Sequence, residues 1–220
     1  MALQLREDLP SIVILGGFDP RGLHPLWFRS ENLLGHEEAA QAELNDMRPD
    51  VTEWSTESLL LHATRDRLLV HARLESAADA VRDLVLGILQ LLEHTRVTAL
   101  GLNRSMHFDV GGEANWHKVG DTLAPKAIWD RHLGTRVGMR VLQLERSPRG
   151  DGLAGKTVVG VYPSVKLAHG VYFDVNNELT IDGGDAGNAR GCAEMISTHW
   201  SRLLDEARTM AESVLEEATQ

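Results

Sequence analysis

A chain of 220 residues, 43% hydrophobic and 25% charged, is long enough to bury a substantial core in one large domain or two small ones. It lacks the apolar run of about 18 residues that a membrane-spanning helix needs. Its N-terminus has acidic residues where a signal peptide is basic, and no apolar run follows directly. We therefore expect a soluble protein of the cytoplasm, and no membrane partner.

The formal charge of −10 is placed unevenly along the chain. Residues 31–57 contain eight acids and a single basic residue, Arg48, whereas residues 58–150 contain thirteen basic and ten acidic residues. A broadly acidic surface repels phosphate backbones, so direct nucleic-acid binding is not expected, whereas a basic partner protein is attracted. The alternative is that these acids only keep the protein soluble. A minor alternative is nucleic-acid binding through a local basic patch in residues 58–150, formed by Arg65, Arg67, Arg73 and Arg104.

The basic residues are eighteen arginines and four lysines, which, with abundant Ala, Gly and Leu, suggests a GC-rich bacterial genome. Cys192 is the only cysteine, which excludes an internal disulfide and a thiolate-rich zinc site. It falls near the start of a predicted helix, where its pKa can be lowered. A lone cysteine in a helix that continues with Ile196 and Trp200 is more often a small buried hydrophobe. No cofactor is predicted.

The first half predicts a strand, a loop, a helix, three strands and a long helix. The opening strand is a run of β-branched residues bounded by Pro10 and a glycine pair. Apolar residues alternate on either side of a polar turn at 64–67, which indicates a hairpin. Ser76 is the expected N-cap of the long helix, and Gly87 within that helix indicates close packing. The expected ranges are 11–17, 18–30, 37–47, 51–55, 59–63, 68–72 and 76–94.

The second half repeats this order. It predicts a strand, a helical stretch interrupted at Pro125, three strands and a longer helix. Asn176 and Asn177 are expected to form a turn that leads into a small additional strand at 179–181. The expected ranges are 97–110, 115–133, 139–145, 157–162, 171–175 and 188–218.

The last helix carries a narrow apolar seam with spacings of four and three residues. The seam either lies across the chain's own sheet or pairs with a second copy of the chain in a homodimer. Alanine and methionine at seam positions weaken the second interpretation. The seam residues are Ile196, Trp200, Leu203, Ala207, Met210 and Val214.

The element order predicts an α+β protein built from two consecutive β-α-β-β-β-α units, residues 1–95 and 96–220, that form one compact unit. Long helices would cover the antiparallel sheet or sheets. Few residues match between the halves; Leu15-Gly16 and Leu100-Gly101 are one such match. The order resembles the β-α-sheet-α plan of TATA-binding-protein-like and helix-grip folds. That resemblance concerns the fold and carries no function with it.

The richest polar segment of the chain is residues 103–117. His107 and Asp109 share one face of the predicted strand, because side chains alternate along a strand. With Glu113 or His117 they could bind a metal, or they could act as a general acid/base pair, but no established metal spacing is present. No metal site is predicted. The residues expected to line a ligand pocket are Asn103, His107, Asp109, Trp116 and His117.

A second segment of interest is the glycine-rich run 183–191, which precedes the last helix. Backbone amides at a helix N-terminus can hold an anion, but the run matches no phosphate-binding motif and Asp185 would repel phosphate. The other interpretation is that Asp185 or Asn188 caps the helix.

Two functions follow from these patterns. The first is a non-enzymatic regulatory or assembly subunit that docks a basic partner through acidic residues, with two tryptophans as apolar anchors. The residues expected at this interface are Glu37, Glu38, Glu43, Trp27 and Trp54. The alternative is a small-ligand-binding protein or an enzyme, with a pocket between the sheet and a helix in the second half.

Overall fold

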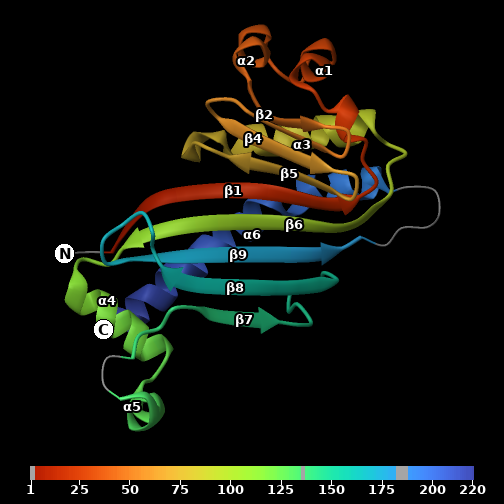
Figure 1. Ribbon diagram of the computed structural model, residues 1–220. Helices are drawn as coiled ribbons and strands as arrows, with labels where there is room; N and C mark the ends of the chain where they lie inside the picture. Colours follow the sequence, from red (N-terminus) through yellow and green to blue (C-terminus); the bar gives the residue numbers. More distant parts are fainter. Residues whose placement is uncertain (1–2, 135–136, 182–187) are drawn as a thin grey trace.

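The computed structural model describes residues 3–134, 137–181 and 188–220, which form an α+β fold around one antiparallel sheet (Figure 1). The described strands number nine, in the order β2-β3-β4-β5-β1-β6-β9-β8-β7. Their bounds are β1 Gln4–Gly16, β2 Glu43–Arg48, β3 Val51–Ser55, β4 Leu59–Thr64, β5 Arg67–Ala72, β6 Val97–Asp109, β7 Leu142–Arg146, β8 Gly155–Pro163 and β9 Gly170–Thr180.

The helices are mostly short, apart from two that cross the sheet. Their bounds are α1 Pro25–Ser30, α2 His36–Gln41, α3 Ala78–Leu91, α4 Glu113–Leu123, α5 Ala127–Leu133 and α6 Ala189–Thr219, with single 3-10 turns η1 at Pro20–Gly22 and η2 at Glu75–Ala77. None of the helices in the described part of the chain has the length and apolar character that a membrane crossing requires.

The two longest strands, β1 and β6, lie side by side in the middle of the sheet. Their ladder runs from the pair Gln4 and Asp109 to the pair Gly16 and Val97. The other strands of the first half extend the sheet beyond β1, and those of the second half extend it beyond β6 (Figure 1). Residues 1–95 and 96–220 therefore contribute to the same sheet.

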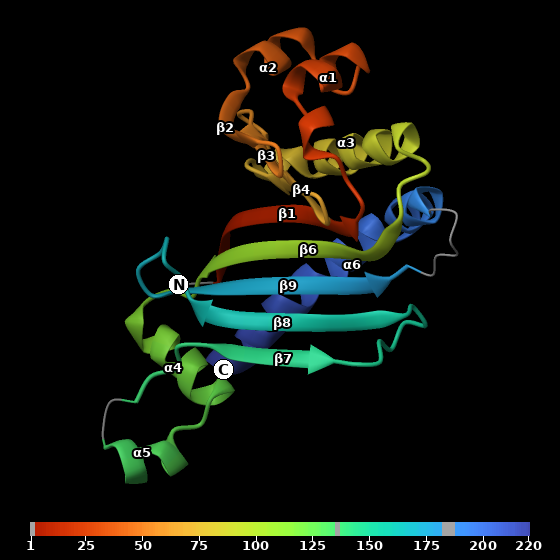
Figure 2. The same ribbon diagram turned by 45° about the vertical axis from the view of Figure 1, so that its right-hand side comes forward.

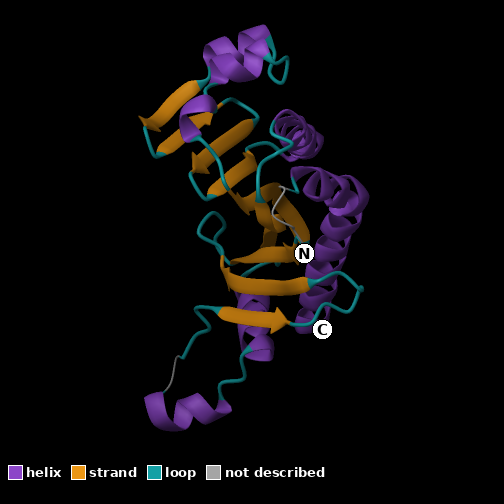
Figure 3. Ribbon diagram, turned by 90° about the vertical axis from the view of Figure 1, so that its right-hand side faces the viewer, coloured by secondary structure: helices purple, strands orange, loops and turns teal. Residues whose placement is uncertain are grey.

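Both long helices pack on one face of the sheet, and no described helix covers the middle of the other face (Figure 3). Alternation along the strands explains why the helices cover one face. Every second side chain of β4 and of β5 is buried in the core, and the residues between them point to the other face. The seam of α6 is buried on the face that the helices cover: Ile196, Trp200 and Leu203 are each at most 2% exposed. The helix thus lies on its own sheet, and this part of the seam is not free to pair with a second copy.

The ends of the sheet carry the short helices. Helices α1 and α2 lie beside β2 and β3, and α4 packs against α6 at the other end (Figure 2). Helix α5 projects away from the rest of the molecule in both ribbon views (Figures 1 and 2). Within α3, the place of a Cβ on Gly87 is only 2.3 Å from the Leu33 side chain, so glycine permits the close packing expected there.

The strand expected at 11–17 begins seven residues earlier, at Gln4, and Pro10 lies inside it. Strand β5 pairs with β1 only from Ser11 to Leu15. At Pro10 the strand therefore has a neighbour on one side alone, where a residue without an N–H group is tolerated. The expected boundary at Pro10 is wrong.

The prediction of a helix at 37–47 is also wrong in its second half. Helix α2 ends at Gln41, and residues from Glu43 form the edge strand β2, paired with β3. Interstrand hydrogen bonds outweigh the local helix propensity of this segment. The first half consequently has four strands after its short helices, not three.

Two smaller expectations are also wrong. Asn176 and Asn177 form no turn but lie inside β9, which is paired on both sides by β6 and β8. The Asn177 side chain accepts hydrogen bonds from Arg149 and Thr157, which satisfies it within the sheet. Ser76 is part of η2, and α3 begins at Ala78 without a side-chain cap.

Candidate ligand-binding site

The face of the sheet opposite α3 and α6, here called the open face, carries a row of polar and aromatic side chains across four neighbouring strands. Glu7 of β1 pairs with His107 of β6, His107 with Tyr172 of β9, and Tyr172 with Tyr162 of β8. Directly paired residues point to the same side of a sheet. We call His107, Tyr172 and Tyr162 the aromatic row.

The three rings of the aromatic row lie against one another. The imidazole of His107 stacks on Tyr172 with centroids 4.5 Å apart and planes at 24°, and Tyr162 follows at 5.6 Å and 34°. A Cβ on Gly160 would lie 2.6 Å from the Tyr162 ring, so glycine gives that ring its space. The rings cover one another's faces, so the row presents ring edges to the cavity, and an aromatic ligand would meet them edge to face.

Hydrogen bonds hold the row in place. His107 Nδ1 lies 2.8 Å from Ser164 Oγ, and Tyr172 Oη lies 3.1 Å from Ser105 Oγ. Glu7 accepts from Lys166 Nζ at 2.6 and 2.8 Å, and its carboxylate is 3.6 Å from His107 Nε2. These contacts fix the directions of the His107 and Tyr172 rings and place Lys166 beside the row.

Burial keeps His107 and Tyr172 uncharged near neutral pH. Desolvation lowers the pKa of His107 and of the nearby His71, because burial disfavours the imidazolium form. Desolvation likewise raises the pKa of the Tyr172 phenol. These two neutral rings can thus stack on one another and exchange neutral hydrogen bonds with a ligand.

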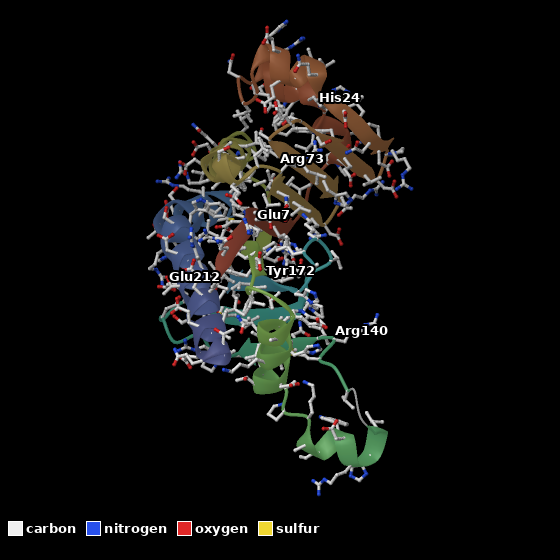
Figure 4. All side chains as sticks on the ribbon, turned by 90° about the vertical axis from the view of Figure 1, so that its left-hand side faces the viewer. Glu7, His24, Arg73, Arg140, Tyr172 and Glu212 are labelled. Carbon is white, nitrogen blue, oxygen red and sulfur yellow. The ribbon has the colours of Figure 1, made fainter. Side chains whose placement is uncertain are left out.

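A cavity of about 590 Å³ lies over the row, within the size range of small-molecule sites. Its fixed charges are Glu7, Lys166 and Arg140, so the cavity has one positive charge in excess. Lys166 is neutralised by Glu7, whereas Arg140 has no ion-pair partner among the described residues. Figure 4 shows Glu7 and Tyr172 close together, with Arg140 on the same side and Glu212 on the opposite side, on α6.

Ser164, His107 and Glu7 follow one another like a catalytic triad, but their geometry does not activate the serine. Ser164 Oγ already accepts the backbone N–H groups of Lys166 and Leu167 at 3.1 and 3.0 Å. A hydroxyl oxygen engaged by two donors is a poor nucleophile, and its role is to close the turn after β8. The arrangement does not equip Ser164 for acyl transfer.

The residues predicted for a ligand pocket occupy three places. Asn103, His107 and Asp109 share the open face of β6, but only His107 lines the cavity over the row. Asp109 accepts hydrogen bonds from Arg6 and Gly111, and Asn103 lies in a second hollow of the same face. Trp116 and His117 are on α4.

Trp116 and His117 line a further cavity of about 830 Å³ beside α4 and α5. The Trp116 indole donates to the carbonyl of Gly170 at 3.1 Å, which joins α4 to the start of β9. This cavity shares Tyr162 and Pro163 with the cavity over the row. The five predicted residues thus do not converge on one pocket. Trp116 and His117 line a cavity between α4 and strands β8 and β9, and a cavity of about 290 Å³ between β7–β9 and α6 contains none of the five.

The residues predicted as partner anchors belong to the core instead. Trp54 is completely buried, meets Phe28 edge-on at 5.1 Å and donates from its indole to Leu23 at 2.9 Å. Trp27 is half-buried against Phe28. Trp54 is therefore a core residue in this structure, since no surface of its side chain reaches solvent.

The acidic residues predicted for the same interface are more accessible. Glu37 and Glu43 are exposed, whereas Glu38 accepts hydrogen bonds from Thr56 and Ser58 at 3.1 and 3.2 Å. Five of the eight acids between residues 31 and 57 are exposed, namely Glu31, Glu37, Glu43, Asp50 and Glu57.

The remaining sequence features are structural or undescribed. Burial raises the pKa of the Cys192 thiol to about 12, and the side chain is fully buried, which confirms it as a small hydrophobe. Asp185 and most of the glycine-rich run lie outside the described residues. Asn188 accepts from the backbone of Val97 at 2.8 Å and caps no helix N–H. Within the described ranges, no group of three His, Cys, Asp or Glu side chains could hold a metal ion.

Sequence reasoning missed Glu7, His71, Tyr162, Tyr172, Arg140 and Lys166, all of which line the cavity over the row. One signal was present: Tyr172 and Asp174 alternate with apolar Val171, Phe173 and Val175, which marks a strand with one polar face. Comparison with models of known protein families and with curated proteins finds no match for this chain.

Proposed function

We propose that this chain is a binding protein of the bacterial cytoplasm that holds a flat, anionic small ligand on the open face of its sheet. The aromatic row at the floor of the 590 Å³ cavity carries the proposal. A ligand ring that meets the edge of Tyr172 would gain about 0.5–1.5 kcal/mol beyond its burial. The guanidinium of Arg140, which has no ion-pair partner in the described part of the chain, favours an anionic group at the rim.

The proposal is tested with 4-hydroxyphenylacetate and its uncharged amide as probes, measured by calorimetry and NMR titration. Wild type is expected to bind the carboxylate about fivefold more tightly, since a partly exposed ion pair contributes about 1 kcal/mol. Arg140→Gln should remove this preference, and Tyr172→Leu should weaken both probes. Arg146→Gln, which makes the same charge change away from the cavity, should do neither. Absence of binding, or binding that Tyr172→Leu leaves intact, would refute the site.

We also propose that the protein docks a basic partner in a regulatory or assembly role, through the exposed acids of residues 31–57. The specific support is the edge strand β2, which has a neighbour on one side only and exposes Leu44 and Met47 among these acids. An extended basic peptide could pair with this edge through backbone hydrogen bonds.

A decapeptide of alternating lysine and valine is a suitable probe for that edge. Its affinity should fall about tenfold or more between 50 and 300 mM NaCl, because exposed charges are screened. The triple variant Glu37→Gln, Glu43→Gln, Asp50→Asn should bind weakly. A control with three neutralised acids on α6 (Glu206→Gln, Glu216→Gln, Glu217→Gln) should bind like wild type. Equal loss in both variants would show an effect of net charge alone and would overturn the edge as the docking surface.

The two halves are proposed to be equivalent β-α-sheet-α units, as in the fold analogy drawn above. The support is positional: β1 and β6 are adjacent at the centre, and α3 and α6 each follow the last strand of a half and cover the same face. The additional strand β2 belongs to the first unit only.

A further inference from the structure

A second hollow of about 300 Å³ lies on the open face, further along β6 and β9 from the aromatic row. Asp174 stands two residues beyond Tyr172 and pairs with Ser105, and the next open-face pair is Asn103 with Asn176. The hollow therefore lies over the two open-face rows that follow Tyr172 on the same strands, the first with Asp174 and the second with Asn103 and Asn176.

The polar groups of this hollow are incompletely partnered among the described residues: the Asp174 carboxyl has a hydrogen bond with Ser105, and two amide oxygens have none. Asp174 forms no ion pair within the described ranges, and burial raises the pKa of its carboxyl. The Oδ1 atoms of Asn103 and Asn176 are buried and, among the described residues, receive no hydrogen bond. They lie 3.2 and 3.4 Å from where a Cβ on Gly101 would stand, so both amides converge over that glycine.

Such groups are costly in a folded protein unless something else satisfies them. Three acceptors that share one hollow call for a donor with several N–H groups and a positive charge. Asp174 and Glu178 outnumber Arg67 among the charged residues that line it, so the local charge is negative. The cavity over the aromatic row has the opposite excess charge.

We infer that this hollow binds the ammonium group of the ligand whose ring lies on the aromatic row, so that the ligand is a peptide-like zwitterion. The inference rests on the proposed ligand function. The carboxylate of the ligand faces Arg140, its ring faces Tyr172, and its ammonium group meets Asp174, Asn103 and Asn176.

The spacing of the rows fits an extended peptide. Successive open-face rows are two residues apart, which corresponds to about 7 Å along a strand. Side chains at alternate positions of an extended peptide have the same spacing and point to the same side. A lysine and a C-terminal phenylalanine separated by one residue would thus reach both subsites.

The test compares N-acetyl-Lys-Gly-Phe with N-acetyl-Nle-Gly-Phe, which differ only in the terminal ammonium group, by calorimetry at pH 7. Wild type should bind the lysine peptide about tenfold more tightly, as expected for hydrogen bonds to a charged group. Asp174→Asn should abolish the preference and leave the norleucine peptide unchanged. Tyr172→Leu should weaken both peptides. Spermidine, which has ammonium groups but no ring, should bind much more weakly than the lysine peptide.

The outcomes separate the two proposals. Equal affinity for both peptides, or a preference that survives Asp174→Asn, overturns the ammonium subsite and leaves the aromatic site standing. Spermidine that binds as tightly as the lysine peptide overturns the zwitterion as ligand class. If wild type binds neither peptide, both proposals fall. Misfolding does not confuse the result, because Asp174→Asn removes a carboxylate that burial disfavours and should melt no lower than wild type at pH 7.

Discussion

Replacement of Asp8 by alanine is expected to lower the free energy of unfolding by about 3–5 kcal/mol, as when one partner of a buried ion pair is removed. Asp8 of β1 and Arg104 of β6 are only 10% and 12% exposed, and Arg104 Nε lies 2.6 Å from the Asp8 carboxylate. Arg104 also donates to the carbonyl of Leu204 in α6. The pair joins the two central strands to the long helix. Without Asp8, the buried guanidinium keeps only a 4.0 Å contact with the exposed carboxylate of Asp205 among the described residues.

Urea denaturation followed by circular dichroism measures this loss. Glu194→Ala on α6 is the matched control, because it breaks an ion pair with Arg190 in which both side chains are more than 60% exposed. Exposed pairs contribute little, so the control should unfold close to wild type. A loss for Asp8→Ala no larger than that of the control would show that the pair does not hold the sheet to α6.

Trp54→Ala is expected to destabilise the protein by about 3–5 kcal/mol, the usual range for truncation of a buried aromatic residue. Trp54 is fully buried, and its removal would leave a cavity beside Phe28 and an unpartnered carbonyl at Leu23. Typical domains are stable by only about 5–15 kcal/mol, so the variant should be close to unfolding at 37 °C.

Thermal and urea unfolding check this prediction, with Trp129→Ala as control. Trp129 is 55% exposed on α5, so its truncation should change the melting temperature little. The pair also tests the location of Trp54. If Trp54→Ala stays as stable as Trp129→Ala but loses binding to the lysine-valine decapeptide, then Trp54 would be an interface residue after all.

Local pattern predicted much of the fold. Period-two alternation in residues 59–72 identified the β4–β5 hairpin, and the apolar stripe from Val81 to Ile88 identified the helix that covers it. These predictions succeed because one buried face imposes its period on a single segment. They fail at residues 43–48 and 176–177, where strand neighbours far along the chain supply the stabilising contacts.

The candidate site could be predicted only in part. His107 was expected to face a ligand, and the structure places it in the aromatic row. Its neighbours Glu7 and Tyr172 lie 100 and 65 positions away in sequence, and they meet it through the register of β1, β6 and β9. Nothing in a short window encodes that register.

The sequence by itself determined the α+β class and the alternation that gives strands one apolar and one polar face. It also determined the burial of Cys192 and the concentration of acids in residues 31–57. The tertiary structure alone decided that the helices share one side of the sheet and that the other side stays open. It also decided which open-face side chains meet. The physical reason is that alternation is set residue by residue, whereas strand order and register depend on the packing energy of the whole chain.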